Sequence, residues 1–197
     1  MSKRWMAVPA MLVAVILSVA CATQKAPAEA ALTAADTAFA AAQTEAAKYV
    51  PDQVKGVEDA IAAAKDSFAK GDYQAALTAA QALPAKISDL TAAAAAKKAE
   101  LMKSWETLST GLPQVVASIQ SRMDILSKSK KLPAGMDQAK FDGAKAGLDT
   151  IKQSWTEATT AFTAGNVADA VAKANTVKAK AAEVLGALGM PVPSGLQ

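Results

Sequence analysis

Apolar and alanine residues recur along most of the chain with alternating gaps of three and four residues. This spacing places them on one face of a helix, whereas a strand would alternate at every second residue. The first stripe runs from Leu32 to Tyr49, and the second from Val54 to Phe68. Pro51 precedes the second stripe, where a proline suits a first helical turn. The pattern indicates helices that pack side by side.

Four further stripes follow with the same spacing. They cover residues 73–108, 115–126, 141–162 and 167–188. Pro84 lies inside the third stripe and predicts a kinked helix or two collinear helices. The sequence Gly-Leu-Pro at 111–113 predicts a break before the fourth helix. The chain is therefore predicted to be all-α, an antiparallel bundle of about six helices, with residues 190–197 as a flexible tail.

Two pairs of residues, Gly71-Asp72 and Gly165-Asn166, punctuate the stripes. Glycine adopts the left-handed conformation that ends many helices, and Asp or Asn caps the next helix. Both pairs are therefore predicted to be structural turns. They lie 94 residues apart, and the same offset relates Phe68 to Phe162. This correspondence indicates an internal duplication of a three-helix unit, and two unrelated alanine-rich hairpins are the alternative.

The N-terminus carries the pattern of an export signal. Lys3 and Arg4 precede an apolar stretch of fifteen residues, 6–20. A membrane-spanning helix needs about 20 such residues, so the stretch is short for a span. It matches the apolar region of a secretory signal peptide, and residues 1–20 are predicted to be one. Cys21, the only cysteine of the chain, follows directly.

Cys21 has two alternative fates. Val19-Ala20-Cys21 resembles the last three positions of a bacterial lipoprotein signal, although Ser18 stands where that signal prefers Leu, Val or Ile. The resemblance implies lipid attachment at Cys21, with residues 21–30 as a lipidated tether. Alternatively, Ala20-Cys21-Ala22 is an ordinary cleavage site, and cutting before Thr23 releases a soluble periplasmic protein. Lipidation is favoured because the sole cysteine lies at the signal boundary.

The residue after the cysteine bears on the membrane in which the protein resides. By resemblance to the sorting pattern of double-membraned bacteria, Ala22 instead of Asp implies an outer-membrane lipoprotein that faces the periplasm. A lipid-anchored protein needs several acyl chains for stable attachment. The predicted partners are this membrane and a further envelope protein.

The composition offers little catalytic chemistry. The chain has no histidine and one cysteine, which removes the commonest general base, the commonest metal ligand and any intrachain disulfide. No catalytic residue, cofactor or metal is predicted. Alanine supplies 50 of the 197 residues, so the core is expected to be thin, and a small-molecule ligand is not expected. The carboxylate pairs Glu58/Asp59 and Asp66/Asp72 lie among lysines, where ordinary ion pairs are expected.

The charge is nearly balanced, with 21 Lys and Arg against 18 Asp and Glu. A nucleic-acid-binding protein would show a concentrated basic face. The densest basic cluster, Lys128, Lys130 and Lys131, is typical of a solvated loop. No nucleic-acid partner is therefore predicted.

Two family resemblances concern the first half of the chain. The segment SFAKGDYQAALTAAQALP, residues 67–84, resembles the centre of a tetratricopeptide repeat, in which small residues let two helices cross closely. No 34-residue recurrence accompanies it. Residues 1 to about 90 resemble uncharacterised alanine-rich bacterial envelope lipoproteins. That resemblance implies an exported all-α protein and brings no known activity or site residue.

These observations predict a non-enzymatic, membrane-anchored envelope lipoprotein that acts as a helical scaffold or partner-binding module. A soluble periplasmic binding or chaperone-like protein is the alternative. The helical part is predicted to divide into units 31–110 and 111–189. Aromatic residues dominate binding hot spots, so four aromatic residues are candidate partner anchors. Two of them, Trp155 and Tyr73, are expected in the core. The four are Trp105, Trp155, Tyr49 and Tyr73.

Overall fold

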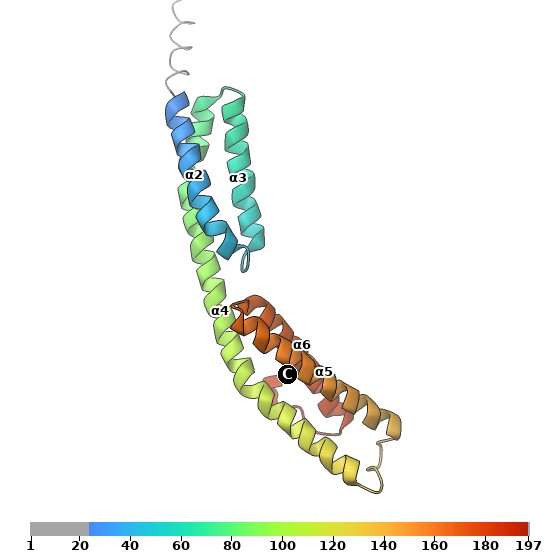
Figure 1. Ribbon diagram of the computed structural model, residues 1–197. Helices are drawn as coiled ribbons and strands as arrows, with labels where there is room; N and C mark the ends of the chain where they lie inside the picture. The colour runs from blue at the N-terminus through green and yellow to red at the C-terminus, as the bar shows by residue number, and fades with distance from the viewer. Residues whose placement is uncertain (1–23, 197) are drawn as a thin grey trace, which may run out of the picture. The chain divides into compact units, whose positions relative to one another are not determined.

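A computed structural model of the chain describes residues 24–196. All regular secondary structure in these residues is helical, with five α-helices and one short 3-10 helix (Figure 1). The elements are α2 (Lys25–Ala46), α3 (Pro51–Ala69), α4 (Tyr73–Lys128), α5 (Gln138–Thr163), α6 (Val167–Ala187) and η1 (Ser194–Leu196). The all-α prediction is confirmed. The number of helices differs from six because the predicted third and fourth helices are one helix, α4.

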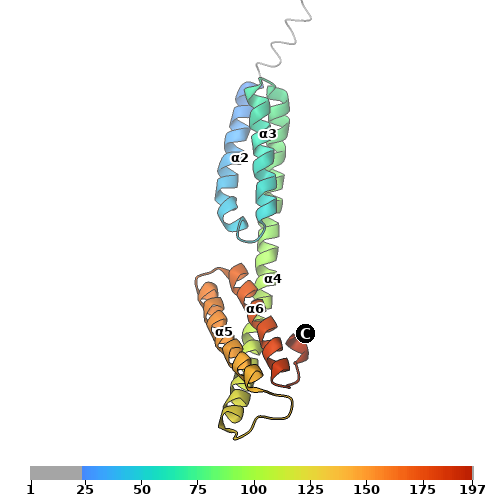
Figure 2. The ribbon, with the colours of Figure 1, turned by 90° about the vertical axis from the view of Figure 1, so that its right-hand side faces the viewer.

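The chain divides into two compact units, and the division falls between Lys97 and Lys98, inside α4. In the first unit, α2 and α3 lie beside the first part of α4, residues 73–97 (Figure 2). In the second unit, α5 and α6 lie beside the second part of α4, residues 98–128. This division differs from the predicted one between residues 110 and 111, where α4 continues without a break.

Burial explains why α4 continues through Gly111 and Pro113. Leu112 is only 1 % exposed in the second unit, and Ile119 is completely buried. Burying a leucine or isoleucine side chain contributes about 1.5–3 kcal/mol. Two such side chains on one helical face offset the roughly 3 kcal/mol that a proline costs inside a helix. The apolar stripe thus overrides the local preference for a turn, as it does at Pro84.

Part of the predicted tether is helical. Residues 25–30 form the first turns of α2. Pro27 lies in the first turn, where a backbone N–H has no helical partner and its absence costs little. Ala28 is completely buried, so this turn already packs against the unit. Of the described residues, only Gln24 remains from the predicted tether.

The core of the first unit follows the predicted stripes. Its buried residues come from α2, from the α2–α3 connection, from α3 and from the first part of α4. They include Leu32, Ala35, Phe39, Tyr49, Val54, Val57, Ile61, Ala76, Leu83, Ile87 and Leu90. On the surface, Lys65 Nζ of α3 lies 2.8 Å from Asp36 Oδ2 of α2. The Phe68 and Tyr73 rings meet edge to face at 5.1 Å between centroids. Apolar burial therefore holds this unit together, with few polar contacts between helices.

The two predicted glycine turns have nearly the same backbone geometry. Gly71 has φ +82° and Gly165 has φ +81°. The N–H of Asp72 donates to the Ser67 carbonyl at 3.0 Å, and that of Asn166 donates to the Ala161 carbonyl at 2.9 Å. These bonds close the helix end in the manner of a Schellman motif.

The polar residues after the two glycines act differently. Asp72 Oδ1 accepts the N–H of Ala75 at 3.1 Å, which is the predicted helix cap. The Asn166 side chain makes no cap hydrogen bond, and only its backbone carbonyl accepts a bond, from Ala170. Asn166 therefore occupies the cap position without the predicted side-chain role.

In the second unit, α5 and α6 approach each other closely at Gly147. A Cβ atom at this position would lie 2.6 Å from Val184 Cγ2 of α6. Gly147 is buried, and the buried residues Leu148 and Ile151 follow it on α5. The missing side chain at residue 147 is therefore what allows this helix–helix contact.

We expect Gly147→Ala to destabilise the protein by about 1–3 kcal/mol, because the added methyl group overpacks the contact with Val184. Gly143 lies one turn earlier on α5 and has open space around its Cβ position. Gly143→Ala should therefore stabilise the protein by about 0.5–1 kcal/mol through helix propensity alone. Urea unfolding followed by circular dichroism measures both effects, and effects of the same sign would contradict the close contact.

Candidate functional site

A stack of three aromatic rings fixes α4 against α5 in the second unit. The Trp105 ring lies 5.6 Å from that of Trp155 and 4.5 Å from that of Phe162, with interplanar angles of 8° and 10°. Trp105 is 8 % exposed, whereas the other two side chains are half-buried. Trp105 is therefore a core residue. Tyr49, also 8 % exposed, is equally unsuited to the predicted role of partner anchor.

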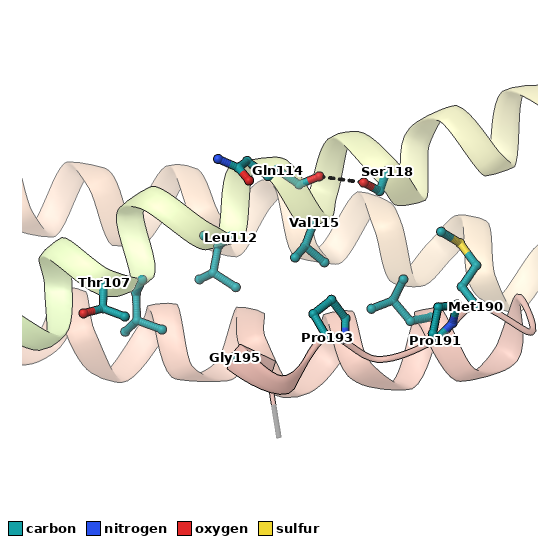
Figure 3. A pocket seen from close by; sticks show the side chains of 12 residues that line it. Thr107, Leu112, Gln114, Val115, Ser118, Met190, Pro191, Pro193 and Gly195 are labelled. Atoms are coloured by element: carbon teal, nitrogen blue, oxygen red, sulfur yellow. Dashed lines mark hydrogen bonds between the residues drawn. The ribbon is translucent and has the colours of Figure 1, made fainter.

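An apolar pocket of about 480 Å³ lies in the same unit, between α4 and the segment that follows α6 (Figure 3). Leu108, Leu112 and Val115 of α4 form one wall. Met190, Pro191 and Pro193 contribute to the other wall, and Val115 and Pro193 face each other across the space. The volume lies within the roughly 300–1,000 Å³ of small-molecule sites.

The second wall exists because α6 ends in a third glycine turn. Gly189 has φ +66°, and the N–H of Met190 donates to the Leu185 carbonyl at 2.9 Å. The fixed φ angles of Pro191 and Pro193 then limit the conformations of the segment between α6 and η1. The 3-10 helix η1 contacts α6. Residues 190–195 therefore lie against the second unit, and the flexibility predicted for residues 190–197 stays a prediction.

The side chains around this pocket carry no ionisable group. The polar residues among those that line it are Thr107, Gln114 and Ser118. The Ser118 hydroxyl donates to the backbone carbonyl of Gln114 at 2.9 Å, so its proton already has an acceptor. The pocket can therefore bind an apolar group, but it offers no side chain that could accept or release a proton near neutral pH.

The carboxylates for which ordinary ion pairs are predicted lie on exposed helix surfaces. Asp59 pairs with Lys55 at 3.3 Å, and Asp66 pairs with Lys70 at 2.5 Å. Asp72 caps α4 through Ala75. These are the ordinary surface interactions expected from the spacing, and the structure does not bring them into a common pocket.

The clearest pKa shifts belong to an ion pair between α5 and α6. Lys173 Nζ lies 3.1 Å from Glu157 Oε2. Hydrogen bonds from Lys173 and Gln153, together with the charge of Lys173, lower the pKa of Glu157. The bond to Glu157, followed by the charge of Asp169, raises the pKa of Lys173. Both groups lie at the surface, so the pair joins α5 and α6 but adds little to stability.

The predicted lipid-attachment residue, Cys21, and the predicted signal peptide 1–20 lie outside the described residues. Within residues 24–196, no helix is long and apolar enough to cross a membrane. The same residues contain no group of three or more His, Cys, Asp or Glu side chains that could hold a metal ion. No protein-family model, curated protein or solved structure gives a significant match to the chain.

We expect Lys173→Gln to raise the pKa of Glu157 toward its ordinary value, because the main hydrogen bond and the neighbouring charge are lost. In the wild type, the contribution of Glu157 to stability is complete above its pKa in the unfolded chain. That contribution is lost as the pH falls through the lowered pKa of the folded protein. Carboxyl carbon NMR measures the titration directly. Lys145→Gln, elsewhere on α5, is the control, and an unchanged Glu157 midpoint in Lys173→Gln would contradict the assignment.

Proposed function

We propose that the protein is a non-enzymatic, membrane-anchored envelope lipoprotein, a helical scaffold whose second unit binds a partner. The observation that carries this proposal is the apolar pocket between α4 and residues 190–195. It has space for an apolar side chain or segment and lacks any ionisable side chain, so its chemistry supports binding and offers nothing for proton transfer.

The proposed anchor rests on the sequence of the N-terminus. Residues 6–20 have the length of a signal-peptide core, and Cys21 follows in a lipoprotein-like context. Residues 22–24 alone separate Cys21 from α2. In the lipidated form the first unit would therefore be attached close to the outer membrane, facing the periplasm. The alternative, cleavage before Thr23, makes the same bundle a soluble periplasmic binding or chaperone-like protein.

We further infer that the two units descend from one three-helix unit. Helices α3 and α5 end 94 residues apart, at Ala69 and Thr163, and the helices that follow them begin at Tyr73 and Val167. Buried residues correspond at the same offset. The pairs include Val54 and Leu148, Val57 and Ile151, Ala64 and Ala158, Ala76 and Ala170, Ala80 and Ala174, and Leu83 and Val177. In this interpretation α4 joins the last helix of one copy to the first helix of the next.

Mass spectrometry of the mature protein from a bacterial envelope tests the anchor. We expect an N-terminal Cys21 that carries acyl chains, and we expect Cys21→Ala to abolish acylation and to release the protein from the membrane fraction. A mature N-terminus at Thr23 would exclude lipidation and leave the soluble alternative. Because that result concerns the anchor alone, partner binding requires a separate experiment.

Site-specific crosslinking in the intact envelope tests the pocket. A photoreactive amino acid at Gln114, on the rim of the pocket, should form a discrete adduct with a partner protein. Val115→Trp in the same chain should abolish this adduct, because the larger ring fills the pocket. A probe at Glu58, exposed on α3, is the control. The proposal fails if both probes give the same adduct, or if the adduct persists in the Val115→Trp protein.

A further inference from the structure

A half-buried arginine in the second unit has no partner for its buried nitrogen. Arg122 lies on α4, and its Nε atom is buried and makes no hydrogen bond. A guanidinium group remains charged and presents five donors in a planar fork. Buried donors almost always have a partner, and an exception requires an explanation such as a missing ion or ligand.

The Arg122 side chain lines a hollow of about 460 Å³. The loop residues 133–136 form one wall, and residues 186–189 at the end of α6 form another. The Lys140 side chain lines the same hollow, and its Nζ donates to the carbonyl of Gly135 at 2.9 Å. That bond holds the ammonium group at the wall and leaves two of its three donors. No Asp or Glu lines the hollow, so two cations face it without a lining carboxylate.

The nearby end of α6 does not explain Arg122. Arginine near a helix C-terminus often donates to the last free carbonyls. Here backbone N–H groups already occupy three of the four carbonyls of the final turn. Leu188, Gly189 and Met190 donate to Val184, Gly186 and Leu185, respectively. The glycine turn thus closes the helix without the guanidinium group, and Arg122 remains available to a ligand.

The surrounding charges favour an anion. The loop before α5 carries Lys130 and Lys131, both exposed. The acidic side chains of this region are engaged elsewhere. Asp137 accepts a hydrogen bond from the N–H of Lys140 and so caps α5. Asp124 accepts one from the side-chain amide of Gln120, and Asp142 accepts one from that of Gln138. These neutral donors leave the three carboxylates charged, so the four basic side chains of the region, Arg122, Lys130, Lys131 and Lys140, exceed the acidic ones by one charge.

We propose that the hollow at Arg122 and Lys140 binds the phosphate group of a small phosphate monoester. Guanidinium groups bind phosphate through two parallel hydrogen bonds, and lysine adds a point charge. The two cations match a phosphate dianion better than a single carboxylate. The hollow has the volume of a small-molecule site, which leaves space for the organic part of the ester. This site is separate from the apolar pocket and does not depend on the membrane anchor.

The side-chain Nε–H signal of Arg122 in NMR tests the proposal, with glycerol 3-phosphate as the probe. We expect a saturable shift with glycerol 3-phosphate, and none with glycerol or with potassium chloride at equal ionic strength. Arg122→Gln and Lys140→Gln should each weaken binding about tenfold or more, because each removes a charge-assisted hydrogen bond. For Arg122→Gln, backbone amide shifts report binding. Lys145→Gln, an exposed lysine outside the hollow, is the matched control.

A second arm separates free phosphate esters from lipid headgroups. Vesicles that contain phosphatidic acid are compared with vesicles of phosphatidylcholine. Binding to phosphatidic acid together with binding of glycerol 3-phosphate supports the site and makes a headgroup one of its ligands. Binding to vesicles without any shift from glycerol 3-phosphate would overturn the proposal, as would equal binding by Lys140→Gln and the Lys145→Gln control. Circular dichroism verifies that each variant is folded.

Discussion

Burial along one face of α4 is the constraint on which both units depend. The helix supplies the first unit with Leu83, Ile87 and Leu90, and the second with Leu112, Ile119 and Met123, all of them buried. A proline interrupts the backbone hydrogen bonds within each set, at residues 84 and 113. An isolated helix would bend or break at these positions. Here the neighbouring helices hold both sets of side chains, so each unit forms only if α4 remains helical through its own proline.

The small size of the core residues sets the second constraint. Alanine buries little area, so each unit must bring its helix backbones close together to gain enough apolar contact. The contact of Gly147 with Val184 is the tightest case among the glycines, because a single added methyl group would collide with Val184. Ion pairs between helices, such as Lys65–Asp36, are exposed and add little to stability. Among the described residues no polar or charged side chain is fully buried. Packing of small apolar surfaces therefore determines the helix arrangement.

Much of this arrangement could be predicted from the sequence. The six stripes identified nearly all of the buried positions, because helical spacing reports directly which face is removed from water. The left-handed glycines at 71 and 165 were also predictable, because the turn chemistry is local. The absence of a break at 111–113 was not predictable, since it depends on the burial of Leu112 by residues far along the chain. The same limit applies to both hollows. The walls of the apolar pocket, at Leu112 and Pro193, are about 80 residues apart in sequence, and no periodicity links them.

The end of α6 is where the second unit gains its candidate chemistry. Residues 186–189 form a wall of the hollow at Arg122, and residues 190–195 form a wall of the apolar pocket. Gly189, with φ +66°, redirects the chain between the two. At the proposed offset of 94, the corresponding residue of the first unit is Ala95, where α4 continues as a helix. If the units are copies, they differ at this position. Ala95 lets the last helix of the first copy continue, whereas Gly189 ends the last helix of the second copy. That difference explains why a scaffold of two similar bundles would carry its binding sites on the second, since only a terminated helix frees a segment to fold back and enclose them.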